Sequence, residues 1–171
     1  DIPSVGATEN LMLAAILAEG ATRIQNAAQE PEIVDLANFL NAMGADISGA
    51  GTSEIVINGV TQNDLHPIEY TTIPDRIEAG TYMAAIIATQ GKGIIKNVLP
   101  SHLTFYNSKL IKMGANIKLI EPTVIEVSCN QRLKSVNIVP QPYPGFPTDL
   151  QSLAMAMLTT ADGVSIITCL L

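Results

Sequence analysis

The stretch LNAMGADI at residues 40–47 decides the fold, because it returns at residues 110–117 as LIKMGANI, seventy residues further along the chain. In each copy an apolar, helix-like stretch stops at a glycine, Gly44 or Gly114, and a short apolar strand follows. Self-similarity at a fixed spacing indicates a structural unit that is repeated along the chain. The sequence therefore predicts two copies of one unit built from helices and strands.

Further matches support the repeat and predict the start of a third copy. They pair Ala14-Ala15 with Ala84-Ala85 at an offset of 70, residues 24–26 with residues 95–97 at an offset of 71, and residues 83–86 with residues 153–156 at an offset of 70. Repeats of this length are too long for most solenoids. They suit an α/β (α+β) domain of a few βαβαββ units around a pseudo-symmetry axis, sharing a core of apolar helices.

Each unit is predicted to run helix, strand, helix, strand, strand, from the spacing of its apolar residues and the positions of its glycines. The predicted ranges are 7–19, 22–27, 31–43, 46–49 and 54–58 in the first unit, and 76–89, 93–97, 102–113, 116–119 and 123–127 in the second. Residues 61–72 break this rhythm with a polar, proline-containing stretch. We interpret them as a connector between domains, and a long surface loop within one domain is the alternative.

Composition limits the function classes. The 171 residues allow one domain or parts of two, and 47% of them are hydrophobic, which excludes a disordered chain. A net charge of −7 argues against nucleic acid as a partner. Two cysteines and two histidines without ligand spacing predict no metal site and favour a reducing, cytoplasmic compartment. No apolar run reaches the roughly 18 residues of a membrane span.

Both ends of the sequence resemble the interior of a longer protein. The chain begins Asp1-Ile2-Pro3, with neither a starting methionine nor a basic leader. Residues 164–171 are mostly apolar and are predicted to form a core strand. An incomplete domain exposes apolar edges, and association with a second copy is one way to cover them.

Ser4, Val5 and Gly6 stand at the start of a strongly helical stretch. Serine is a good N-cap, and a helix start offers unpaired N–H groups and partial positive charge to a phosphate. Small residues there let a ligand approach closely. An ordinary helix cap is the alternative.

Thr148 and Asp149 follow a rigid turn, GFP at residues 145–147, and begin the third copy. Asp149 is either a simple helix-start acid or a carboxylate that accepts a hydroxyl proton at a cleft. At a third helix start, Asp75, Arg76 and Glu78 crowd together, and local ion pairing explains them. The two cysteines and two histidines (Cys129, Cys169, His66, His102) have no catalytic partner beside them, so we interpret them as structural.

Five strings carry a resemblance to a known family: SVGATEN at residues 4–10, AEG at 18–20, NAAQEPEIVD at 26–35, PDRIEAGT at 74–81 and FPTDLQ at 146–151. They resemble enolpyruvyl transferases of the UDP-N-acetylglucosamine 1-carboxyvinyltransferase type, over nearly the whole chain. The sister family, 5-enolpyruvylshikimate-3-phosphate synthase, shares the repeated architecture but not this set of strings. The resemblance implies two inside-out α/β barrels of three βαβαββ units each, with the active site in the cleft between them.

On that pattern residues 1–71 are the last repeat unit of one domain. Residues 72–171 are the first unit and the start of the second unit of the other domain. The implied reaction moves the enolpyruvyl group of phosphoenolpyruvate to the 3-hydroxyl of UDP-N-acetylglucosamine, releasing phosphate, in peptidoglycan synthesis. The resemblance implies no cofactor and no metal.

By the same resemblance, Ser4, Val5 and Gly6 contact the nucleotide diphosphate. The FPTDLQ string, which includes Thr148, places Asp149 at the 3-hydroxyl as its base.

Three departures limit what the resemblance implies. Family members can carry a lysine where Ile2 stands. The family's phosphoenolpyruvate-binding lysine and arginines, and its reactive cysteine, fall outside the chain. After Thr168 the family continues with an acidic residue, whereas here Cys169 follows. We therefore expect the chain alone to be inactive. The alternatives are a sugar-nucleotide-binding or scaffolding module that has lost catalysis and an enolpyruvyl transferase for a shikimate derivative.

Overall fold

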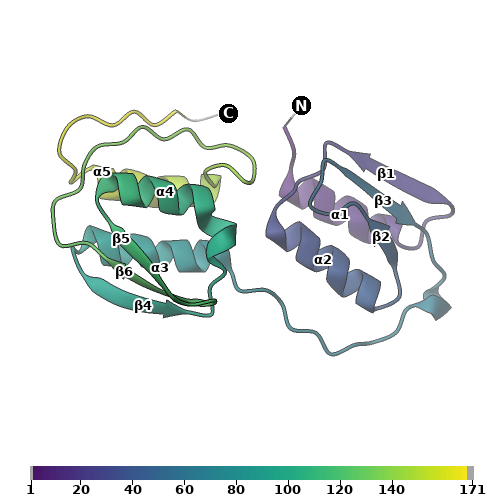
Figure 1. Cartoon of the computed structure of the whole chain (residues 1–171). Coiled ribbons are helices and arrows are strands. Elements are labelled where there is room, and N and C mark those ends of the chain that lie inside the picture. Colours follow the sequence, from purple (N-terminus) through teal and green to yellow (C-terminus); the bar gives the residue numbers. More distant parts are fainter. Residues whose placement is uncertain (1, 169–171) are drawn as a thin grey trace. The chain divides into compact units, whose positions relative to one another are not determined.

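The computed structural model describes residues 2–168. The chain divides into two compact units, Asp1–Ile73 and Pro74–Leu171 (Figure 1). This division lies two residues from the predicted boundary at 71/72. The assignment of the units to the last repeat of one domain and the beginning of the other stays a prediction.

The first unit contains two α-helices and a three-stranded sheet, which can be followed in Figure 1. Its elements are α1 (Val5–Ala15), β1 (Ala21–Gln25), α2 (Pro31–Ala42), β2 (Asp46–Ser48), β3 (Glu54–Asn58) and the 3-10 turn η1 (Gln62–Asp64). The strands lie in the order β1-β3-β2, and β3 pairs antiparallel with both neighbours. Alternation along β3 buries Ile55 and Ile57 in the core.

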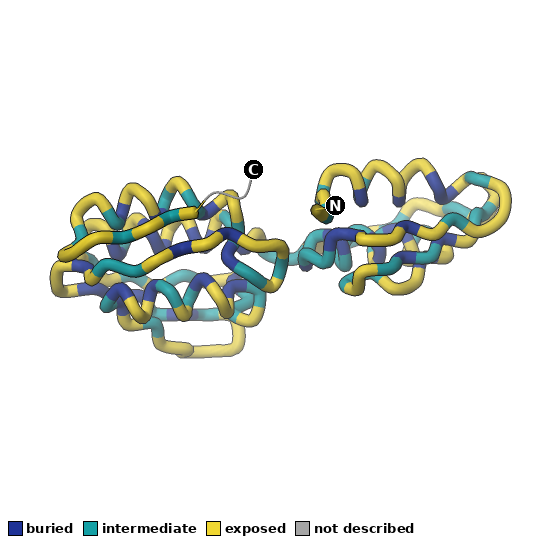
Figure 2. The backbone as a smooth tube through the Cα atoms, turned by 90° about the horizontal axis from the view of Figure 1, so that it is seen from above, coloured by how far each residue is buried: buried dark blue, intermediate teal, exposed yellow. Residues whose placement is uncertain are grey.

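The second unit repeats this arrangement and adds a helix. Its elements are α3 (Arg76–Ala88), β4 (Lys92–Lys96), η2 (Pro100–Leu103), α4 (Thr104–Met113), β5 (Asn116–Glu121), β6 (Val124–Ser128), η3 (Thr148–Leu150) and α5 (Gln151–Leu158). The strand order β4-β6-β5 matches that of the first unit, again with antiparallel pairing to the central strand. Each unit has its own apolar core, and buried positions recur along the helices at intervals of three to four residues (Figure 2).

The structure corrects one of the residue pairings predicted between the two repeat units. The N-caps of α1 and α3, Ser4 and Asp75, are 71 residues apart, and so are Asn26 and Asn97, which both have positive φ. Strands β2 and β5 begin 70 residues apart. The offset therefore changes from 71 to 70 between Asn26 and Asp46, where the first unit has one extra residue, and the pairing of Ala14-Ala15 with Ala84-Ala85 was off by one position.

Two predicted elements differ from the structure. Helix α1 ends at Ala15 and not at Glu19, because the Ile16 carbonyl accepts the N–H of Val60 at 2.8 Å instead of continuing the helix. The predicted core strand at the end of the chain is wrong for its described part. Val164 is 84% exposed, and this segment makes only isolated bridges, such as Ile138 with Ile167. Residues 169–171 lie outside the described residues.

The fold class is confirmed in part. Both units combine helices with an antiparallel sheet in the predicted order, but each described sheet has three strands and stays open. Barrel closure is therefore not confirmed.

Candidate functional site

The start of α1 combines a capped helix end with open space. Ser4 has extended backbone angles, φ −120° and ψ 123°, and its Oγ accepts the N–H of Ala7 at 3.3 Å. Ser4 and Gly6 are both exposed, and a Cβ placed on Gly6 would meet nothing within 4 Å. The first turn contains no acidic residue. This helix start is therefore open to an anion, which its N–H groups and dipole favour.

A buried threonine ties this helix start to the rest of the first unit. Thr8 is 3% exposed, and its Oγ1 donates to the Ser4 carbonyl at 2.8 Å while accepting the N–H of Ala28 at 3.0 Å. The neighbouring Ala27 N–H donates to the Ser53 carbonyl at 3.0 Å. Sequence reasoning missed Thr8, because a threonine inside a helix gives no sign of a partner twenty residues away.

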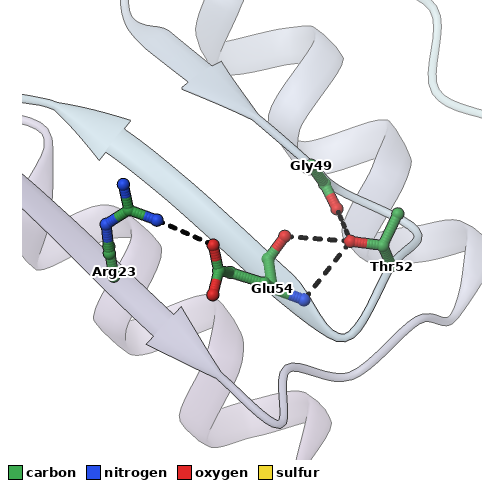
Figure 3. Close-up of polar contacts among 4 residues, drawn as sticks. All are labelled: Arg23, Gly49, Thr52 and Glu54. Atoms are coloured by element: carbon green, nitrogen blue, oxygen red, sulfur yellow. Dashed lines mark hydrogen bonds and ion pairs between the residues drawn. The ribbon is translucent and has the colours of Figure 1, made fainter.

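The β2–β3 turn, which contains Ser53, carries a second group of polar contacts at the surface (Figure 3). The Thr52 hydroxyl lies within hydrogen-bonding distance of two carbonyl acceptors, those of Gly49 and Glu54, at 2.8 and 2.9 Å. Arg23 pairs with Glu54 at 2.8 Å, but the two side chains are 65% and 44% exposed. A pair this exposed contributes about 0–1 kcal/mol. The cluster therefore holds the turn and shows no feature of a binding site.

Thr148 and Asp149 lie at the surface of the second unit, on a turn whose neighbours are anchored in the core. Both are exposed, whereas Phe146 and Leu150 on either side are 1% and 0% exposed. The Phe146 ring packs edge-on against Tyr106 with centroids 5.5 Å apart. Among the described residues, the Asp149 carboxylate has no hydrogen-bond or ion-pair partner. It is therefore an accessible acceptor on a turn held between two buried side chains.

Three of the other residues that the sequence analysis considered, Asp75, Arg76 and Cys129, make contacts that stabilise the fold or are buried in it. Asp75 caps α3, with Oδ1 accepting the N–H groups of Ile77 and Glu78 at 2.7 and 3.2 Å. Arg76 is 7% exposed, and its guanidinium lies 5.7 Å from the centre of the Tyr143 ring. Cys129 is buried.

A pocket of about 250 Å³ lies beside the start of α3 in the second unit. It is lined by Pro74, Asp75, Glu78, Ala79, Tyr82, Ile95, Lys96 and Asn97. The negative charge of the Asp75 carboxylate lies at the N-terminus of α3, where it offsets the partial positive charge of the helix dipole. The second unit thus has an acidic helix start where the first unit has the neutral Ser4.

Residues 2–168 contain neither a metal-binding cluster nor a membrane-spanning helix. No group of three or more histidine, cysteine or acidic residues in this range is arranged to hold a metal ion. Over the same residues, no helix has the length and apolarity needed to cross a membrane.

Comparison with known proteins decides the family. A family model described as EPSP synthase (3-phosphoshikimate 1-carboxyvinyltransferase) matches residues 1–169. The chain belongs to this family. Within the EPSP synthase family, the chain is 57% identical over 169 residues to UDP-N-acetylglucosamine 1-carboxyvinyltransferase 2 of Carboxydothermus hydrogenoformans, covering 98% of the chain and 40% of that relative. It is also 57% identical over 167 residues to UDP-N-acetylglucosamine 1-carboxyvinyltransferase of Thermotoga maritima, covering 97% of the chain and 39% of that relative.

The predicted resemblance to UDP-N-acetylglucosamine 1-carboxyvinyltransferases is thereby confirmed, and the chain spans about 40% of the length of these relatives. Among solved structures, the enolpyruvyl transferase NikO from Streptomyces tendae matches with a TM-score of 0.81 at 24% identity. That match covers 95% of the chain and 40% of NikO. It shows that the chain shares its fold with this enolpyruvyl transferase.

Proposed function

We propose that the chain is part of an enzyme that transfers the enolpyruvyl group of phosphoenolpyruvate to the 3-hydroxyl of UDP-N-acetylglucosamine, for peptidoglycan synthesis. The observation that carries this proposal is the 57% identity, over nearly the whole chain, to relatives with that name. The substrates are then these two small molecules, with neither nucleic acid nor a membrane as partner. The lack of paired cysteine spacing favours the cytoplasm as its location.

The geometry suggests a role for each candidate residue. The open start of α1 at Ser4, Val5 and Gly6 suits the diphosphate of the nucleotide sugar, because the N–H groups of a helix start can donate to an anion and the first turn contains no acidic residue. The exposed carboxylate of Asp149 suits removal of the proton from the sugar 3-hydroxyl, with Thr148 beside it as a further contact.

The reaction then proceeds by addition and elimination. The deprotonated 3-oxygen bonds to C2 of phosphoenolpyruvate while C3 takes a proton, which gives a tetrahedral intermediate. Loss of a proton from C3 and cleavage of the bond between C2 and the phosphate oxygen restore the enol double bond and release phosphate. Asp149 accepts the first proton in this scheme.

The proposal is tested in a longer protein in which these 171 residues replace the matching stretch of the Thermotoga maritima relative. We expect phosphate release that depends on both substrates, and we expect Asp149→Ala to lower kcat by about 10²-fold or more, the usual contribution of a general base. Asp162→Ala is the matched control, since Asp162 is an acid of the same unit that is 66% exposed and pairs with Arg132 at the surface. Near-normal turnover in Asp149→Ala would remove Asp149 from the mechanism.

The 171 residues alone are expected to show no turnover, because the chain spans about 40% of these relatives. Phosphate release above background would contradict this. A binding or scaffolding module without catalysis is the alternative function, and calorimetry with UDP-N-acetylglucosamine distinguishes it. Binding by the chain, combined with no turnover in the longer protein, would favour the module.

Self-association of the chain also stays a prediction. Leu11, Leu13 and Leu17 on and just after α1 are 51%, 52% and 57% exposed, so this segment offers apolar surface to a second copy. Sedimentation of the isolated chain tests it, and a monomer at all concentrations would contradict it.

A further inference from the structure

Gly80 occupies an unusual place, in the interior of α3. Glycine lowers helix stability relative to alanine, so it needs a reason inside a helix. The backbone does not supply one, because Gly80 is not among the glycines with positive φ. Gly80 is also buried. The reason must therefore lie in what packs against it.

Leu150 packs directly on the backbone of α3 at this glycine. A Cβ on Gly80 would lie 2.7 Å from Leu150 Cδ1 and 3.0 Å from Leu150 Cδ2, well inside van der Waals contact. The Gly80 carbonyl also accepts the hydroxyl of buried Tyr106 at 3.1 Å. The helix surface at Gly80 is therefore a seat for the Leu150 side chain, which is fully buried there.

This contact is one of three that hold the segment leading to Asp149. Upstream, Tyr143 lies against the Arg76 guanidinium, and Phe146 packs on Tyr106. Downstream, Leu150 adjoins Asp149 directly, so its seat is the anchor nearest to the carboxylate. All three contacts come from α3 or α4.

We propose that Gly80 is a positioning residue for Asp149. Its missing side chain lets Leu150 sit on α3, and this seat sets how far the Thr148–Asp149 turn stands from the helix. A methyl group at position 80 pushes Leu150 outward by roughly 0.7 Å to reach ordinary contact distance. Errors of about 1 Å in the placement of a catalytic group can lower a rate by about 10²-fold. This role of Gly80 rests on the proposed function of Asp149 as base.

The test combines Gly80→Ala with a compensating change. In the longer protein described above, we expect Gly80→Ala to lower kcat by roughly tenfold or more. KM for phosphoenolpyruvate should change much less. Adding Leu150→Val shortens the opposing side chain and should restore much of kcat. Ala85→Ser is the matched control, because it adds one atom to an exposed position of the same helix, and its kcat should stay unchanged.

A structural measurement separates failure of this inference from failure of the proposed function. In the isolated 171-residue chain, NMR should detect contacts between the Leu150 methyl groups and the Gly80 Hα protons. Gly80→Ala should shift the amide signals of Thr148 and Asp149, and the double variant should return them toward their original positions. If the longer protein has no turnover but these shifts occur, the proposed function fails and the seat stands.

Two results would overturn the inference. The first is a kcat for Gly80→Ala within twofold of the parent; the second is unchanged Thr148 and Asp149 amide signals in that variant. Should Gly80→Ala fail to fold, Leu150→Ala removes the seated side chain without a clash. Loss of amide exchange protection in the turn that carries Asp149 would then support the seat, and full protection would refute it.

Discussion

The most direct test of the site's architecture is Thr8→Val, which keeps the shape of the side chain and removes its hydroxyl. In the native chain this hydroxyl accepts the N–H of Ala28, which is 1% exposed, at 3.0 Å. Valine leaves that N–H without an acceptor where water cannot reach it. The Ser4 carbonyl loses one donor but keeps the Thr8 N–H at 3.0 Å. The deficit is therefore concentrated on the Ala28 amide.

The size of the effect follows from this geometry. A buried donor left unpaired costs about 1–3 kcal/mol, and valine leaves no cavity because a methyl group takes the place of the hydroxyl. We expect the free energy of unfolding of the first unit to fall by about that amount. Exchange of the Ala28 amide should become roughly 5- to 150-fold faster, the same energies expressed as equilibrium ratios.

Thr81→Val provides a matched control on α3. Thr81 makes the same hydrogen bond to the carbonyl four residues earlier, at 2.8 Å, but it is exposed, and within residues 2–168 its hydroxyl accepts no buried N–H. Surface substitutions of this kind usually change stability by less than about 0.5 kcal/mol. The comparison therefore isolates the contribution of the unpaired amide.

Urea unfolding followed by amide NMR signals resolves the two units separately. We expect the signals of the first unit to disappear at lower urea in Thr8→Val, with those of the second unit unchanged. Equal effects of Thr8→Val and Thr81→Val, both under about 0.5 kcal/mol, would refute the reasoning. The Ala28 amide would then have another partner.

Three further perturbations follow from the contacts. Burial raises the pKa of Tyr106 from its ordinary 10.0, so the folded state keeps the proton while the unfolded state loses it above about pH 10. The free energy of unfolding should therefore fall above about pH 10. Tyr106→Phe should remove this component of the pH dependence, measured by denaturant titrations at several pH values. Gly44→Ala should destabilise the protein more than Gly114→Ala, although the two glycines have similar φ values of 112° and 108°. The new Cβ meets a backbone carbonyl of η1 at position 44, but only a flexible glutamine side chain at position 114. Similar decreases of the melting temperature in the two variants would contradict this. Arg23→Ala should change the free energy of unfolding by less than about 1 kcal/mol, because its pair with Glu54 is exposed, and a larger loss would show that the pair is coupled to the turn beneath it.

Much of the local structure could be predicted from the spacing of apolar residues and from the residue types at helix ends. The glycines at 44 and 114 follow the ends of α2 and α4, and Gly114 has the left-handed conformation that Gly44 shares. Ser4 caps α1 as its residue type predicts. These features depend on a few neighbouring residues, so the sequence contains them. The end of α1 could not be predicted, because Val60 captures the Ile16 carbonyl from forty-four positions away.

By itself, the sequence determined the repeat, the order of helices and strands, and the family, because repeated strings and residue spacing are properties of the linear chain. Only the tertiary structure decided how the candidate residues are supported. Thr8 acts on a partner twenty residues away, and Gly80 receives Leu150 from seventy residues away. Neither residue carries a local signal of these contacts. The effect of the Thr8 hydroxyl and of the missing side chain at Gly80 depends on residues that are distant in sequence and that only the fold brings into contact with them.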